Sequence, residues 1–194
     1  MVFVPIATER LVLRPLETRD RARLIELANN WKVAKNLSKM PYPYTEAAAD
    51  WWLGQQDALW VGGKSVTLAV TIEDALIGGI GVGVREDRND EEWELGYWLG
   101  EPYWNRGYAS EAATALRDYA FADAMLPRIV AGHYADNHAS GRILTKLGFR
   151  YTCEVSRHSL ARGAKVKCLE MVLARERWLE INVDGKVDEL AALV

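Results

Sequence analysis

The spacing of apolar residues changes most clearly between residues 91 and 113. Residues 93–99 are rich in aromatic and aliphatic side chains, which predicts a β-strand. From Tyr108 onward, small and apolar residues recur every three or four positions, which predicts a helix that ends near Ala122. A short loop, residues 101–107, joins the two elements and ends on Gly107. The pattern therefore predicts a strand, a loop and a helix in direct succession.

The segments before this stretch predict three strands and two helices. An alternating pattern at residues 11–13 indicates a first strand, and Thr18 is a suitable N-cap for the helix that follows it. Thr45 is the corresponding N-cap of a second helix. A β-branched run and a glycine-rich run, separated by a turn at residues 74–75, predict a hairpin made of Ser65–Ile72 and Leu76–Val84.

The segments after it predict a parallel crossover and a closing pair of strands. Arg128–Tyr134 has the composition of a strand, so the strand–helix–strand order implies parallel pairing through a right-handed connection. Residues 136–140 open a further helix, which Gly148 ends. Two closing strands and a last helix are expected at Arg150–Arg157, at Val166–Ala174 and from Arg175. The expected fold class is therefore α/β (α+β), a single domain with a mixed central sheet of about six or seven strands flanked by helices.

Length and composition fit one globular domain. The chain has 194 residues, of which 49% are hydrophobic and 26% charged, and its formal net charge is −3. This balance gives no basic footprint for a nucleic-acid partner. No apolar run approaches the roughly 20 residues that span a bilayer, so no membrane partner is expected. We expect residues 1–182 to form the domain and residues 183–194 to form a C-terminal tail.

The cysteines and histidines offer no metal or redox motif. Cys153 and Cys168 have a spacing that fits neither, and we expect buried free thiols rather than a disulfide. The three histidines, at positions 133, 138 and 158, lack the spacing of zinc ligands. The N-terminus shows no basic region followed by a long apolar one, so no secretory signal is expected. These features favour a cytoplasmic protein.

Candidate chemistry gathers where the loop meets the helix, at Gly107. A glycine there allows a ligand to approach the backbone closely. The first turn of a helix has N–H groups without intrahelical partners at the positive end of the helix dipole, so the position favours an anion such as a diphosphate. Arg106 would add a charge-assisted bond at the mouth of this site. A single glycine is also compatible with an ordinary strand-to-helix turn.

The residues around Gly107 narrow this choice. Tyr97-Trp-Leu-Gly, followed by Tyr103-Trp-x-Arg-Gly-Tyr-Ala-Ser-Glu-Ala112, resembles the acyl-CoA-binding segment of the GCN5-related N-acetyltransferases (GNAT), and most closely their RimJ/RimL-like ribosomal-protein branch. The opening residues 8–16 and the later Asn137-x-x-Ser140 and Lys146-Leu-Gly-Phe149 match the same branch. Trp104 departs from the wider superfamily, where Gln or Arg is more usual, but agrees with this branch. The resemblance covers about residues 8–177.

This resemblance implies an acetyl-CoA-dependent N-acetyltransferase that needs no metal. The loop backbone and the first turn of the helix would hold the CoA pyrophosphate, and the preceding strand would pair with the pantetheine arm. The implied cofactor-binding residues are Trp98, Leu99, Trp104, Asn105, Arg106, Gly107, Tyr108, Ala109, Ser110 and Asn137. Asn137 could bond to the pantetheine amides, or it could serve only as the N-cap of its helix.

A carboxylate on the central strand is the candidate general base. The attacking amine must be neutral, so the site must accept a proton directly or through water. The family often has a carboxylate at the position of Glu94, which we therefore expect to take this role. The alternative for Glu94 is an ordinary solvated or ion-paired strand carboxylate. Glu92 shares its face of the strand and is the reserve candidate.

The leaving sulfur and the oxyanion require hydrogen-bond donors. Many superfamily members use a tyrosine for the sulfur, at the position that Leu144 occupies here. Ser140, one helical turn earlier, is the catalytic candidate that the RimJ/RimL-like branch suggests, and Tyr134 is a weaker alternative. The resemblance places the oxyanion donor near Leu99, as a strand N–H left free by a bulge.

The acceptor is the part of the reaction that the sequence leaves most open. In the family, the helical region near residues 29–55 forms one wall of the acceptor site, so Tyr42 and Tyr44 are the candidate substrate-binding residues, with core packing as the alternative. We expect a protein N-terminal α-amine as acceptor. A small-molecule amine (amino acid, polyamine or antibiotic) and a non-catalytic CoA-binding regulatory module are the alternatives. A homodimer is common among relatives.

Overall fold

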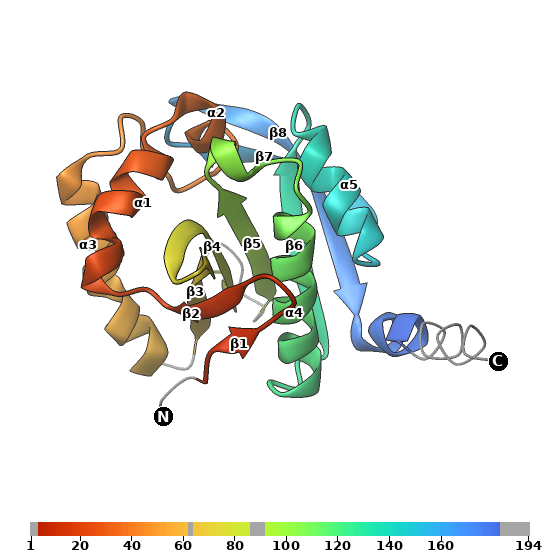
Figure 1. Ribbon diagram of the computed structural model, residues 1–194. Coiled ribbons are helices and arrows are strands. Elements are labelled where there is room, and N and C mark those ends of the chain that lie inside the picture. Colours follow the sequence, from red (N-terminus) through yellow and green to blue (C-terminus); the bar gives the residue numbers. More distant parts are fainter. Residues whose placement is uncertain (1–3, 62–63, 86–91, 183–194) are drawn as a thin grey trace.

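The described residues form one mixed sheet of eight strands with flanking helices (Figure 1). The computed structural model describes residues 4–61, 64–85 and 92–182. The strands are β1 (Ile6–Ala7), β2 (Val12–Pro15), β3 (Ser65–Ile72), β4 (Ala75–Val84), β5 (Trp93–Leu99), β6 (Arg128–Tyr134), β7 (Arg150–Ser159) and β8 (Ala164–Ala174). The α-helices are α1 (Arg21–Ala28), α2 (Trp31–Ala34), α3 (Glu46–Val61), α4 (Tyr108–Ala122) and α5 (His138–Lys146). Two 3₁₀ turns, η1 (Thr18–Asp20) and η2 (Glu101–Tyr103), and helical residues 175–182 complete the structure.

The strand order confirms the expected fold class and the expected crossover. In the described ranges the order is β1-β2-β3-β4-β5-β6-β8-β7, and the neighbours are antiparallel except β5 and β6, which run parallel. The connection between these two strands carries α4, which crosses the sheet in Figure 1. The sheet exceeds the expected size by a short strand, because β1 adds to the edge through pairing of Ile6 with Leu13.

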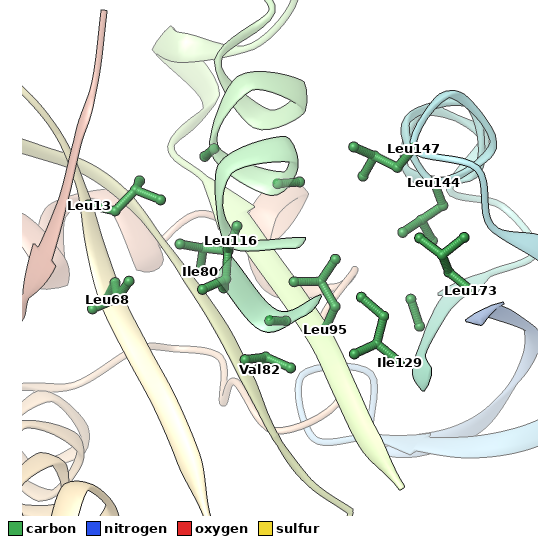
Figure 2. Packing of buried hydrophobic residues seen from close by; sticks show 14 of the residues in the cluster. Leu13, Leu68, Ile80, Val82, Leu95, Leu116, Ile129, Leu144, Leu147 and Leu173 are labelled. Carbon is green, nitrogen blue, oxygen red and sulfur yellow. The ribbon is translucent and has the colours of Figure 1, made fainter. Parts of the chain in front are cut away.

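The two faces of the sheet are covered by different helices. Because side chains alternate along a strand, Leu68 and Val70 of β3 join a main core with α4 and α5, whereas Ala69 joins a second core with α1 and α3. Figure 2 shows Leu116 of α4 beside Ile80 of β4 in the main core. The loops at the ends of β5 and β6 are thereby held on a rigid scaffold.

Glycines in β4 allow β5 to approach it closely. A Cβ atom on Gly79 would lie 2.7 Å from Nε1 of Trp98, so only glycine leaves room for that indole. The β3–β4 turn lies at Glu73 and Asp74, which both have positive φ, one residue earlier than expected. The glycine-rich strand is thus a packing surface for Trp98.

The helix caps are partly as expected. Thr45 Oγ1 accepts from the Ala48 N–H at 3.2 Å and confirms the predicted cap of α3. Thr18 does not cap its helix, because Glu17 precedes a 3₁₀ turn and its N–H donates to Asp20 Oδ2 at 2.9 Å. The short α2, capped by Asn30, was not expected, because four residues carry too little periodicity.

The two cysteines of the chain differ in their exposure. Both cysteines are free, as expected, but only Cys168 is buried. Cys153 is exposed because β7 is an edge strand of the sheet. No helix in the described part of the chain is long and apolar enough to cross a membrane. The expected tail at residues 183–194 lies outside the described residues.

Candidate active site

The site is built where β5 and β6 separate. Among the described residues, their Cα pairing is limited to Glu94 with Val130. Each strand is nevertheless paired along its whole length on its other side, β5 with β4 and β6 with β8. The two parallel strands therefore diverge toward their C-terminal ends, and α4 and α5 both begin beyond those ends (Figure 1).

This divergence leaves one backbone edge of β5 facing the gap between the C-terminal parts of β5 and β6, which we call the opening. The Gly100 N–H donates to Ile77 O of β4 at 2.9 Å. By the alternation of an antiparallel ladder, even-numbered residues of β5 bond to β4, and odd-numbered ones direct their N–H and C=O groups toward β6. Beyond Leu95, no described residue of β6 is in register to meet them. The N–H groups of Tyr97 and Leu99 therefore face the opening, as a strand that pairs with an extended ligand requires.

Two expectations about β5 change with this geometry. The register of β5 with β4 is continuous throughout the described strand, so the expected bulge is wrong and divergence of β6 frees the Leu99 N–H instead. Trp98, an even-numbered residue, directs its backbone toward β4, and its indole packs over Gly79. Any contact of Trp98 with a ligand would therefore involve its side chain and not its backbone.

The first turn of α4 presents an open set of backbone donors. Gly107 is its N-cap and has a φ of +81°, a left-handed conformation that favours glycine. The Gly107 carbonyl accepts from the Glu111 N–H at 3.0 Å, so the N–H groups of residues 108–110 have no acceptor within the helix. The Gly107 N-cap has no side chain to cap them, and residues 105–107 are exposed. This turn has the form of an anion site.

Arg10, from the N-terminal segment, lies beside this turn. Its Nη1 donates to Arg106 O at 3.0 Å, and its guanidinium carbon is 4.7 Å from the centre of the Tyr108 ring. The Glu111 carboxylate accepts from Arg10 Nε at 2.7 Å and from Thr8 Oγ1 at 2.6 Å. Burial raises the pKa of Glu111, but these bonds outweigh it and hold that pKa below its usual range. Glu111 is therefore a structural anion paired with a cation.

Trp104 fixes the loop between β5 and α4. Its Nε1 donates to Leu99 O at 2.8 Å, and its ring packs against the main core. The carbonyl of Leu99 is thus occupied within the protein, while its N–H stays directed at the opening. Trp104 therefore holds the end of β5 and the start of the loop together.

Ser140 lies across the opening from β5. Its hydroxyl oxygen is 3.0 Å from the Tyr97 hydroxyl, and its N–H donates to Asn137 Oδ1 at 3.3 Å. The second contact confirms Asn137 as an N-cap, and its role toward pantetheine stays a proposal. The hydroxyl of Tyr134, the weaker alternative, donates instead to His158 O at 3.2 Å. The structure thus brings Ser140 together with β5 and directs Tyr134 away.

Glu94 lies on the other face of β5, within a group of charges. Arg157 Nη1 donates to Glu94 Oε1, and Arg157 Nη2 donates to Glu170 Oε1 at 2.8 Å. Arg85 lies 4.0 Å from Glu94 Oε2 and 2.9 Å from Glu170 Oε1. Burial raises the pKa of Glu170, but both arginines outweigh it and lower that pKa. Glu94 is therefore ion-paired through both oxygens, with Arg157 at Oε1 and with Arg85 at Oε2.

The two candidate acceptor residues are placed differently. Tyr44 is 6% exposed and packs into the second core, where burial raises its pKa to about 12. Tyr42 is 44% exposed and makes an edge contact with Trp31, at 5.4 Å between ring centres. Tyr42 is therefore the one of the two that an acceptor could reach without repacking the core.

Several residues near the site were not found from the sequence. Each makes its contact with a residue that is far away in the sequence: 43 positions for Tyr97, 101 for Arg10 and 63 for Arg157. A local sequence pattern cannot predict contacts between such distant positions. Glu92, the reserve base, is buried and pairs with Arg128 at 3.3 Å. Within the described residues, no group of three or more potential ligands could hold a metal ion.

The comparisons with known proteins agree on one family. The model of the family described as Acetyltransferase (GNAT) domain matches residues 10–150. The uncharacterized N-acetyltransferase p20 of Bacillus licheniformis is 30% identical over 173 residues, which cover 88% of this chain and 96% of that protein. Mycobacterium smegmatis RimJ, solved in complex with CoA-disulfide, has a TM-score of 0.73 at 20% identity and covers 89% of each chain. RimL, described as a ribosomal L7/L12 alpha-N-protein acetyltransferase and solved with coenzyme A, has a TM-score of 0.76 at 16% identity, covering 88% of this chain and 98% of its own. These two structures share the fold.

Proposed function

The chain belongs to the GNAT family of acetyltransferases, and we propose that it uses acetyl-CoA to acetylate a protein N-terminal α-amine. Acetyl transfer follows from membership of the family, whereas the acceptor and the residue roles below are proposals. These proposals are based mainly on one observation, that β5 diverges from β6 next to the uncapped first turn of α4. An exposed strand edge and a ready anion site together suit a ligand with an amide-containing arm and a diphosphate.

The residues present fit acetyl-CoA, which supplies an acetyl group activated as a thioester. The N–H groups of residues 108–110 and the side chain of Arg106 would hold the diphosphate. The outward backbone groups of Tyr97 would bond to an amide of the pantetheine arm, and the outward N–H of Leu99 would remain for the thioester carbonyl. Trp104 would keep these two parts of the site in register through its bond to Leu99 O.

Glu94 is the proposed proton acceptor for the amine. At pH 7, deprotonating a lysine amine costs about 4.6 kcal/mol, whereas deprotonating an α-amine costs only about 1 kcal/mol. Glu94 Oε1 accepts from Arg157, whereas Oε2 lies 4.0 Å from Arg85 Nε, beyond hydrogen-bond distance, so Oε2 would accept the proton directly or through water. An α-amine asks less of the base than a lysine side chain does, which is why we propose an α-amine as the acceptor.

Ser140 and Leu99 are the proposed donors to the negative charge that develops during transfer. The Leu99 N–H faces the opening and is suited to a carbonyl oxygen as it gains charge. The Ser140 hydroxyl would donate a hydrogen bond to the departing sulfur. A serine hydroxyl does not ionise near neutral pH, so its contribution is hydrogen bonding and not acid catalysis.

Two observations support a protein N-terminus as the acceptor: the described activity of RimL and the exposed side chain of Tyr42. RimL, which shares this fold, is described as an alpha-N-protein acetyltransferase. Tyr42, exposed beside Trp31, offers an aromatic surface on which an extended N-terminal segment could rest. The proposed partner is therefore a protein N-terminus, and a ribosomal protein is the first class to examine.

Mass spectrometry of an acceptor pool tests this function. The protein is incubated with acetyl-CoA and, in separate reactions, with lysine-free peptides that have free N-termini, with N-terminally blocked lysine peptides, and with small amines. We expect acceptor-dependent release of CoA and acetylation only in the first pool. Transfer only to small amines would overturn the acceptor assignment, and tight CoA binding without any transfer would overturn the proposed turnover.

A further inference from the structure

Tyr97 contacts the proposed sulfur-binding residue from the opposite side of the opening. The phenol oxygen lies 3.0 Å from Ser140 Oγ and 3.4 Å from Ser140 O. The side chain projects from β5 toward the face that α4 covers, and it packs against the main core. The contact therefore joins α5 to β5 across the gap that β6 leaves.

The position of one hydrogen decides what Ser140 can do. If the phenol donates to Ser140 O, the serine hydroxyl can donate to the phenol and is lost to a ligand. If the phenol donates to Ser140 Oγ, the serine hydrogen is free to turn toward the opening. The second arrangement is favoured, because 3.0 Å is nearer the usual O–H···O length than 3.4 Å and because Ser140 O already has a helical partner.

The phenol of Tyr97 is suited to act as a lasting donor. Burial raises its pKa to about 12, and the bond with Ser140 lowers it only in part. The hydroxyl therefore keeps its hydrogen throughout the neutral range. An ionised phenol, by contrast, would accept the serine hydrogen and withdraw it from the opening.

We propose that Tyr97 is a positioning residue for Ser140, whose phenol donates to Ser140 Oγ and so directs the serine hydrogen at the departing sulfur. This inference rests on the proposed function. During transfer the N–C bond forms, the C–S bond breaks, and the sulfur leaves with the electron pair of that bond. The amine loses one proton and the released thiol gains one, while Tyr97 and Ser140 keep theirs.

A double-mutant cycle with a matched control tests this role. The kcat and the KM for acetyl-CoA are measured for wild type, Tyr97→Phe, Ser140→Ala and the double variant, with the lysine-free peptide pool as acceptor. Tyr119→Phe is the control, because it removes a phenol hydroxyl from the same core, far from the first turn of α4. Thermal unfolding shows whether each variant folds, and Tyr97→Phe retains the ring that packs in the core.

The expected kcat is about five-fold lower for Tyr97→Phe and about ten-fold lower for Ser140→Ala, as for the loss of one neutral hydrogen bond. Because Tyr97 acts through Ser140, the double variant should match Ser140→Ala, with the KM for acetyl-CoA unchanged in all four proteins. A wild-type rate in Tyr97→Phe, or a double variant about fifty-fold slower, would overturn the inference while leaving the proposed function intact. Absence of acceptor-dependent turnover in wild type would overturn both.

Discussion

Arg10 and Glu111 are 101 positions apart in the chain and are joined by two hydrogen bonds, from the Arg10 N–H at 2.8 Å and from Arg10 Nε at 2.7 Å. The pair ties the N-terminal segment to the first turn of α4. It also matches the negative charge of Glu111, which would otherwise lie within one turn of the proposed diphosphate site. Arg10 therefore links the two segments and also places a positive charge beside the proposed anion site.

Replacing Glu111 with glutamine should change the dependence of stability on pH. The folded-state pKa of Glu111 is lowered from its usual value of about 4.5, so its charged form stabilises the fold. That stabilisation is complete above pH 4.5 and is lost as the pH falls through the lower folded-state pKa. We expect Glu111→Gln to lower the free energy of unfolding by about 1 kcal/mol at pH 7, with the difference shrinking in acid. Denaturant unfolding between pH 7 and pH 3 measures it, and a difference that does not change with pH would contradict the account.

Two substitutions at Gly107 separate backbone strain from charge. Both Gly107→Ala and Gly107→Asp place a side chain at a φ of +81°, at a cost of about 1–2 kcal/mol. In both, the added Cβ lies 3.1 Å from Arg10 Nη2. Only the aspartate adds a negative charge beside the free N–H groups. Calorimetric titration should show acetyl-CoA binding about ten-fold weaker for aspartate than for alanine. Equal affinities of the two variants would count against a diphosphate at this turn.

Trp104→Phe should destabilise the loop between β5 and α4, because it removes the indole N–H that donates to Leu99 O. The bond from Nε1 to Leu99 O disappears, with an expected loss of about 1 kcal/mol in the free energy of unfolding and a weaker affinity for acetyl-CoA. Trp178→Phe is the matched control, because it removes an indole bond to Asp118 outside the site. The control should lose similar stability at unchanged affinity. If both variants bind acetyl-CoA like wild type, the loop does not depend on Trp104.

Glu94→Gln should reduce transfer without affecting the donor. Loss of a general base lowers kcat by about a hundred-fold or more, while the Kd for acetyl-CoA stays the same because Glu94 lies on the other face of β5. Arg157→Lys, which keeps the charge but cannot bridge Glu94 and Glu170 with a planar fork, should lower kcat to a lesser extent. A wild-type rate in Glu94→Gln would leave the carboxylate as a structural ion-pair partner.

The sequence predicted those features that depend on neighbouring residues. The strand at 93–99 and the helix from Tyr108 follow from local periodicity. Gly107 was singled out because a glycine before a helix lets a ligand approach the backbone closely, whereas its left-handed φ was learned from the structure. The divergence of β5 and β6 could not be predicted, because it depends on how two strands pair with different neighbours. The family resemblance had placed a bulge near Leu99, but the register with β4 is continuous and the N–H is instead freed because β6 diverges.

The environment of the catalytic candidates also depends on contacts that are remote in sequence. Ser140 was identified from its motif, but its contact with Tyr97 spans the opening between two strands. The ion pair of Glu94 with Arg157 was foreseen only as an alternative, because the partner lies on β7. Residue types along the chain therefore indicated the chemistry, whereas the fold determined which groups meet.

A crystal structure with acetyl-CoA bound is the most direct test of the central claim. We predict the pantetheine arm between β5 and β6, bonded to the backbone of Tyr97, with the thioester carbonyl oxygen at the Leu99 N–H and the diphosphate on the N–H groups of residues 108–110. A coenzyme bound at any other place on the molecule would contradict it.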